Sequence, residues 1–251
     1  MTDIDIAVSR LVRARHEHQP QPAPTLADAT AAYAAQERVA RELAWFGTAP
    51  PRYWKSGGAS RAAVISHAPL PPAGVWISPA QAGTWPEARG GIEAEVALRL
   101  RKPVDAERAA TLDLSGAREL IDAMCVSIEI VDSRWAEGTQ APALAQLADV
   151  LSHGALVLGA WVGFESSREW STQVCRVRIG SRPECVFQGT HPLADPVFVV
   201  PAWLRHATRH GQELPAGSIV TTGSWCGLLQ AQAGDRVEVA FDGMGGACVQ
   251  L

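Results

Sequence analysis

Two segments near the N-terminus have the hydrophobic periodicity of amphipathic helices. The first covers residues 3–18, where apolar side chains share one stripe, namely Ile6, Val8, Leu11 and Val12. The stretch QPQPAP at residues 19–24 ends this helix, because proline cannot continue it. The second helix is capped by Thr25 or Asp28 and extends to about Leu43. The segment 1–46 is therefore predicted to be helical.

After this segment the pattern changes to short β-rich runs separated by Gly, Pro and Ser. The candidate strands are RAAVISHA, GVWISP, IEAEVALRL, MCVSIEIVDSRW, GALVLGAWVG, TQVCRVRIG, SIVTTGSW and DRVEVAFDGMGGACVQL. Helices are expected at 112–123, with Ser115 as a cap, and at 196–211. Because strands and helices do not alternate regularly, a doubly wound nucleotide-binding fold is disfavoured. We predict an α+β, mostly β chain in which 47–251 form a β-rich domain, continuous with the helical segment as one structural unit.

The run GGIEAEVALRL at residues 90–100 carries two carboxylates in an otherwise apolar candidate strand. Side chains alternate between the two faces of a strand, so Glu93 and Glu95 emerge as neighbours on the same face as Arg99. Two carboxylates this close repel each other unless a positive charge lies between them. The pair is therefore either a solvated strand face with Arg99 as its counter-charge, or half of a divalent-metal site.

A third carboxylate lies in the middle of another candidate strand, CVSIEIVDSRW at residues 125–135. Glu129 stands between two isoleucines, where an unpaired charge is costly. An arginine such as Arg134 or Arg99 could neutralise it. Three carboxylates from two strands are more than such pairing explains, and ligation by oxygen atoms alone suits Mg²⁺ or Mn²⁺.

Composition narrows the function classes. The chain has 251 residues, 47% hydrophobic and 19% charged, with a net charge of −4, so it can build a large core but offers no basic track for nucleic acid. Its longest apolar runs are too short to span a bilayer, and its N-terminus lacks the apolar centre of a signal peptide. A cytoplasmic protein without nucleic-acid or membrane partners is expected.

Five cysteines without a C-x-x-C pair favour neither a disulfide framework nor a zinc site. The DGMGG segment separates two strand-like runs and is predicted to be a hairpin turn.

Taken in order, these motifs resemble a known family over nearly the whole chain. The E-x-E strand, the second acidic strand ending V-D-S-R and the segment LADVLSHGALVLG are similar to those of the 2-hydroxypentadienoate (2-keto-4-pentenoate) hydratases. These enzymes are related to the 4-oxalocrotonate decarboxylases within the fumarylacetoacetate hydrolase superfamily. Further similar segments are the helix carrying Tyr33 and Gln36, YWKSGGAS, GTHPLADPVFVVPAWLRH and IVTTGSWCGLLQAQAGDRVEVAFDGMG.

The resemblance implies a fold, a metal and a set of site residues. The fold is expected to be a mixed β-roll with a partly closed barrel and N-terminal helices, assembled as a homo-oligomer. Glu93, Glu95 and Glu129 are the implied ligands of Mg²⁺ or Mn²⁺. Lys55 is the implied proton donor or substrate-charge partner, with a pKa lowered toward working pH by the nearby metal and partly apolar surroundings; an ordinary surface lysine is the alternative. Asp149 matches a family aspartate that orients water or holds the lysine, although a cap or turn carboxylate is an equal alternative.

The implied substrates are 2-oxo or 2-hydroxydienoic acids of aromatic compound catabolism. Ser224 matches a loop serine that contacts the substrate carboxylate, and Thr222 is grouped with it as substrate-binding; a turn serine is the alternative. A metal-stabilised enolate serves hydration, decarboxylation of an oxalocrotonate and C–C hydrolysis of an acylpyruvate alike, so the metal motif does not separate them. The leading prediction is a 2-keto-4-pentenoate hydratase-like lyase, with 47–251 as its catalytic domain. The alternatives are a decarboxylase, an acylpyruvate hydrolase and a catalytically degenerate subunit complexed with a pathway enzyme.

Two positions depart from the family pattern. Pro72, in LPPAGVW, stands where the family often has the acidic residue of a P-D-x-G turn. That carboxylate can serve as the acid or base in hydratases, so Pro72 counts against hydration. Val150 replaces the polar residue of the family's A-D-N tripeptide.

Overall fold

The computed structural model describes residues 1–86 and 90–251, and it begins with the two expected helices. Helix α1 spans Asp3–Glu17 and is closed at its start by a capping box between Thr2 and Asp5. Helix α2 spans Ala29–Glu42, and the Asp28 side chain accepts the backbone N–H of Ala31. Of the two caps predicted for this helix, Asp28 is therefore the correct one.

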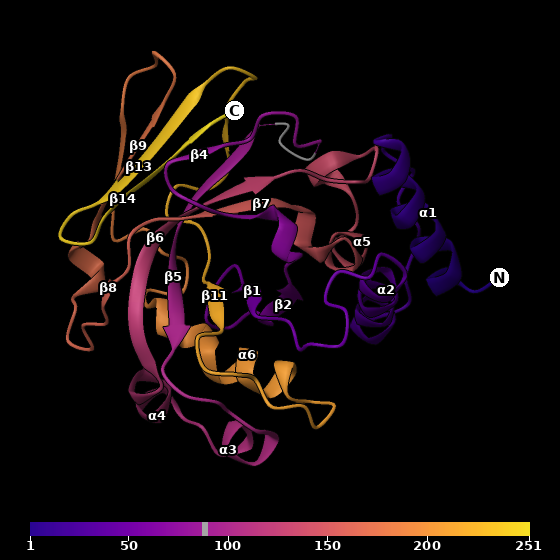
Figure 1. Cartoon of the computed structure of the whole chain (residues 1–251), viewed down its shortest axis with the longest axis horizontal. Helices are drawn as coiled ribbons and strands as arrows, with labels where there is room; N and C mark the ends of the chain where they lie inside the picture. The colour runs from indigo at the N-terminus through magenta and orange to yellow at the C-terminus, as the bar shows by residue number, and fades with distance from the viewer. Residues whose placement is uncertain (87–89) are drawn as a thin grey trace.

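A large curled sheet follows and carries most of the chain's strands. Its order is β2-β1-β11-β5-β6-β7-β3, with β12 paired to β5 and β8 paired to β6. Its strands are β1 (Tyr53–Gly57), β2 (Ser66–Pro69), β3 (Val75–Ile77), β5 (Gly91–Leu100), β6 (Ile121–Val131), β7 (His153–Leu158), β8 (Val162–Gly163), β11 (Ile219–Thr221) and β12 (Leu229–Gln230). The long β5 and β6 run antiparallel through its centre, where Figure 1 shows them crossing the middle of the molecule.

A second sheet of five strands packs beside the first, in the order β10-β9-β13-β14-β4. Its strands are β4 (Ala80–Gln81), β9 (Val174–Ile179), β10 (Cys185–Gln188), β13 (Arg236–Phe241) and β14 (Gly245–Gln250). Strands β13 and β14 pair antiparallel up to Phe241 and Gly245. The DGMGG segment is thus a hairpin turn, as predicted.

The remaining helices are short and differ in places from the sequence prediction. They are α3 (Ala106–Ala110), α4 (Leu114–Glu119), α5 (Ala143–Ala148), α6 (Val200–Ala207) and the 3-10 turns η1 (Pro72–Gly74), η2 (Gly138–Gln140), η3 (Val150–Ser152), η4 (Trp170–Thr172) and η5 (Pro196–Val199). The predicted cap Ser115 is wrong, because Asp113 accepts the backbone N–H of Gly116 and starts α4. The helix expected over 112–123 also ends early, since Ile121 already belongs to β6.

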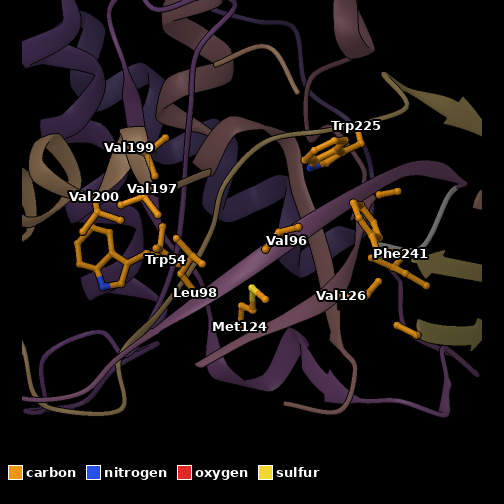
Figure 2. Close-up of a cluster of buried hydrophobic side chains, with 14 of the residues drawn as sticks. Trp54, Val96, Leu98, Met124, Val126, Val197, Val199, Val200, Trp225 and Phe241 are labelled. Carbon is orange, nitrogen blue, oxygen red and sulfur yellow. The ribbon is translucent and has the colours of Figure 1, made fainter. Parts of the chain in front are cut away.

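The two largest of the three hydrophobic clusters among the described residues hold these parts together. The larger lies between the two sheets and α6, and Figure 2 shows side chains of β5, β6, η5, α6 and β13 meeting there, among them Val96, Leu98, Met124, Val126, Val197, Val199, Val200 and Phe241. The smaller joins α1 and α2 to α5 and the buried Trp135. The α+β class with N-terminal helices and a curled sheet is confirmed, whereas the domain boundary at residue 47 stays a prediction. Among the described residues, no helix has both the length and the apolar character needed to cross a membrane.

Candidate functional site

The three predicted glutamates meet on one face of the central strand pair. In the β5–β6 ladder Glu93 lies opposite Glu129, and Glu95 lies opposite Ser127. The apolar residues that alternate with them, such as Val96 and Ile128, point into the large core on the other face. One carboxylate oxygen from each glutamate lies within 4.8 Å of the other two. The alternation of side chains along two neighbouring strands is enough to bring these carboxylates together.

Burial makes this cluster costly without a cation. Glu95 and Glu129 are almost completely buried. Burial and the neighbouring carboxylates raise the pKa of Glu93 to about 8 and that of Glu95 to about 7, although the charge of Lys55 opposes the shift. The Oε2 atom of Glu129 is buried and has no hydrogen-bond partner among the described residues. A divalent ion bound here would supply that partner and neutralise the excess negative charge, so the donor set fits Mg²⁺ or Mn²⁺.

Lys55 reaches this cluster from β1. Its Nζ atom donates to Glu129 Oε1 at 2.6 Å and to the backbone carbonyl of Leu151 at 3.1 Å. Burial acts to lower the pKa of Lys55, but the negative charges of the three glutamates outweigh it, so the pKa is raised above its usual value. Without a cation the carboxylates therefore determine the direction of the shift, whereas the lowered pKa expected for a lysine beside a metal ion stays a prediction.

The carbonyl that accepts from Lys55 belongs to an unusual backbone turn. Val150, Leu151 and Ser152 all have positive φ angles, of 45°, 58° and 58°. Such a left-handed run of residues other than glycine is strained, and strain of this kind is found where function fixes a backbone group. The turn leads directly into β7, whose first residue His153 places Nδ1 3.0 Å from Glu129 Oε1. His153 had no predicted role, because a lone histidine in a sequence is more often structural.

Glu95 is held by the end of β11 and by the loop that follows it. The hydroxyl of Thr221 donates to Glu95 Oε2, and the backbone N–H of Gly223 donates to the same atom at 3.1 Å. Thr222 points to the other side, where its buried hydroxyl donates to the carbonyl of Val96 at 2.7 Å. Ser224 Oγ donates to the carbonyl of Gly227 at 2.8 Å. Thr221 is thus the threonine that faces the cluster, and the substrate-binding roles predicted for Thr222 and Ser224 stay predictions.

Asp149 has arginine partners. Its carboxylate accepts from Arg134 Nε at 2.7 Å and from the Arg134 backbone N–H at 2.9 Å. Arg15 of α1 lies 3.5 Å from the same carboxylate. Burial raises the pKa of Asp149 in spite of these positive charges. The observed contacts join α1, α5 and the end of β6 and include neither Lys55 nor the glutamates, so the catalytic role of Asp149 stays a prediction.

The sequence match to known proteins covers most of the chain. Residues 50–251 match the family described as fumarylacetoacetate (FAA) hydrolase, C-terminal. The chain belongs to this family. The match includes Lys55 and all three glutamates, and it begins just after the N-terminal helices.

Curated relatives and solved structures agree with this assignment. The chain is 34% and 33% identical to 2-keto-4-pentenoate hydratases 1 and 2 of Dechloromonas aromatica, over 155 and 159 residues. Each match covers 61% of this chain but only 57% of the relative's length. The 4-oxalocrotonate decarboxylase from Pseudomonas putida G7, complexed with calcium and acetate, superimposes with a TM-score of 0.80 at 17% identity, covering 100% of this chain and 98% of that one. At that identity the superposition establishes the fold alone.

Proposed function

We propose that the protein is a metal-dependent lyase of 2-oxo or 2-hydroxydienoic acids, most similar in activity to a 2-keto-4-pentenoate hydratase. The observation that carries this proposal is the cluster of Glu93, Glu95 and Glu129 with Lys55 bonded to it. The hydratases of Dechloromonas aromatica provide the substrate class. Each of them is matched over little more than half of its length, so activity and substrate belong to the proposal.

The three glutamates would hold Mg²⁺ or Mn²⁺ at this site. When bound, such a cation supplies Lewis acidity that stabilises the enolate form of a 2-oxo acid. The chain itself keeps the carboxylates in place: Thr221 and Gly223 orient Glu95, while His153 and Lys55 engage one oxygen of Glu129. The other oxygen of Glu129 is thereby left for the cation.

Lys55 is the proposed proton carrier. In the metal-free protein its raised pKa keeps Nζ charged at neutral pH, and the Leu151 carbonyl fixes the direction of one N–H bond. A charged Nζ can deliver a proton to a carbon atom of a dienol as it turns into a ketone. Because Nζ is already fixed beside the cluster, little entropy is lost in bringing the proton donor and a bound substrate together.

A decarboxylase is the second candidate, because Pro72 offers no acid or base at the position where the resemblance to the hydratases implies one. Pro72 begins the turn η1, and its ring carries no titratable group. Loss of carbon dioxide produces the enolate without activating water, so decarboxylation of an oxalocrotonate needs only the cation and the proton carrier. The 3.0 Å contact of His153 with Glu129 supplies the histidine–glutamate pair that an acylpyruvate hydrolase would need, which keeps hydrolysis as a third outcome of the assay.

The proposal is tested by following loss of 2-hydroxypenta-2,4-dienoate with Mg²⁺, with Mn²⁺ and with chelator. Metal-dependent loss that disappears in Glu95→Gln, but not in the control Glu119→Gln on the exposed side of α4, supports a hydratase. Parallel assays with an oxalocrotonate and an acylpyruvate identify the other two reactions by their products. Absence of turnover with all three substrates, in protein shown to bind metal, would contradict an enzymatic role and favour a degenerate subunit.

Assembly and location belong to the same proposal. A homo-oligomer, complexed with a pathway enzyme if the chain is a degenerate subunit, is the expected state, and light scattering of the purified protein measures it directly. A cytoplasmic location is likewise a prediction, tested by cell fractionation.

A further inference from the structure

A pocket of about 380 Å³ lies against the face of β1 that points away from the glutamates. It is enclosed by α2, the segment 44–51, the start of β1 and the segment 209–212. Trp54 lines this pocket, whereas Lys55, the next residue along the strand, reaches Glu129 on the other side. The pocket shares no lining residue with the metal cluster, and its volume suits a small organic ligand.

The floor of this pocket is apolar and partly aromatic. Trp54, Phe46, Pro69 and Ala40 contribute to it. Trp54 is only 3% exposed, and its indole N–H donates to the carbonyl of Pro51 at 3.0 Å. That bond fixes the ring and uses its only donor, so the small part of the ring that reaches the pocket is apolar. A flat ring is the shape that packs best on such a surface.

The rim of the pocket carries more positive than negative charge. Glu37 accepts from Arg209, and His210 Nε2 lies 3.1 Å from the same oxygen. Arg209 also donates to the carbonyl of His206. Arg41, in the last turn of α2, forms no ion pair with the residues that the structure describes. The rim therefore carries two guanidinium groups and one carboxylate, and an anionic ligand would balance the remaining positive charge.

We propose that this pocket binds a single-ring aromatic carboxylate. The ligand ring would pack on Phe46 and against the accessible edge of Trp54, and the carboxylate would accept hydrogen bonds from Arg41 and Arg209. The inference does not depend on the proposed enzymatic activity, because it rests on a different set of residues and is read out by binding alone.

The test is isothermal titration of the full-length protein with benzoate, with acetate and benzamide as reference ligands. Benzoate has few atoms, so a dissociation constant of about 1 mM is expected. Benzamide lacks the charge and acetate lacks the ring, and each should bind roughly tenfold more weakly. Equal binding of acetate and benzoate would overturn the proposal, since it would indicate an anion site without a ring pocket.

Two variants locate the binding. Arg41→Gln removes the charge and Ala49→Trp fills the pocket from its exposed rim, and each should weaken benzoate binding about tenfold or more. Arg101→Gln and Ala110→Trp make the same changes at exposed positions elsewhere and should leave it unchanged. Circular dichroism confirms that all four variants fold.

Benzoate could also bind to a cation held by the glutamates, and a second set of titrations tests this alternative. Titrations are repeated in chelator and with Glu95→Gln, and the benzoate affinity should persist in both. Binding that is lost there, but kept in Arg41→Gln and Ala49→Trp, would place benzoate at the metal cluster and overturn the second site. Absence of binding in the wild-type protein would overturn it as well. Neither result changes the assay for the proposed lyase.

Discussion

At the scale of single residues, the site combines three carboxylates, two of them buried, with one lysine ammonium group. Glu93, Glu95 and Glu129 face one ammonium group, that of Lys55. Such a cluster can lower its energy by binding protons or by binding a metal ion. The raised pKa values of Glu93 and Glu95 describe the first solution, and a divalent cation provides the second.

Replacing Lys55 by Met should separate catalysis from metal binding. Loss of the proton carrier is expected to reduce kcat about 100-fold or more, whereas Mn²⁺ affinity should stay equal or increase because a positive charge beside Glu129 is gone. Steady-state kinetics and calorimetric titration with Mn²⁺ measure the two effects. Lys102→Met, at an exposed position, is the control. A variant that keeps its turnover would show that another group moves the proton.

The two neighbouring threonines of β11 and its following loop should respond differently to the same change. Thr221→Val removes the hydroxyl that donates to Glu95, and metal affinity should fall about 10-fold to 100-fold. Thr222→Val removes a bond to the carbonyl of Val96, so it should cost about 1 kcal/mol of unfolding free energy and leave metal affinity unchanged. Mn²⁺ titration and urea unfolding of both variants test this. The reverse pattern would mean that Thr222 faces the ion.

At the scale of elements, local periodicity predicted the faces of strands but not their partners. The two-residue repeat placed Glu93 and Glu95 on one face, and that face is the one observed. The choice between Thr221 and Thr222 depends on the register of β11 against β5, where Thr221 lies opposite Ala97. That register is a non-local property, set by packing, and cannot be obtained from a three-residue strand.

Irregular backbone was the other feature that periodicity did not predict. The left-handed turn at 150–152 orients the carbonyl that Lys55 contacts, and it begins a strand whose first residue, His153, contacts Glu129. None of its residues is glycine, so the sequence carries no local mark of positive φ angles. Family resemblance located the segment LADVLSHGALVLG, and only the fold shows what the turn does.

The contacts of Asp149 predict an unequal cost for breaking two ion pairs. Asp149→Asn removes a fully buried carboxylate charge that Arg134 and Arg15 contact, which should cost about 3–5 kcal/mol of unfolding free energy. Asp122→Asn breaks the Arg99 pair, whose side chains are about one-third exposed, and should cost less than about 1 kcal/mol. Urea unfolding monitored by circular dichroism compares them. Similar costs for both would show that Asp149 is not a structural anchor between α1, α5 and β6.

At the scale of the whole molecule, the metal site lies on the strands that the entire fold is built around. Strands β5 and β6 support the large core on one face and the glutamates on the other. The N-terminal helices reach the same region through α5 and the turn that follows it. Protonation or metal binding at the glutamates should therefore change the stability of the molecule as a whole, since these strands unfold only with the core.

The metal-free protein should accordingly become less stable as pH rises from about 6.5 to 8. The pKa values of Glu93 and Glu95, about 8 and 7, exceed the usual 4.5, so these groups bind more protons when folded than when unfolded. Their contribution is complete below the unfolded pKa and is lost as pH rises through the folded values. Buried histidines such as His67 and His191, with pKa values of about 3 and 4, act in the opposite direction but only below about pH 6.5.

Thermal unfolding in chelator and in Mg²⁺, at pH 6.5 and pH 8, measures this dependence. The free energy of unfolding in chelator should decrease by up to about 1.4 kcal/mol per pH unit for each glutamate, so the melting temperature should be lower at pH 8 than at pH 6.5. Mg²⁺ should restore stability more at pH 8 than at pH 6.5, because protons no longer compete for the carboxylates. Glu93→Gln should flatten the dependence, since an amide does not titrate. A melting temperature independent of pH and of Mg²⁺ would show that the glutamates neither share protons nor hold a cation, and the metal site would have to be abandoned.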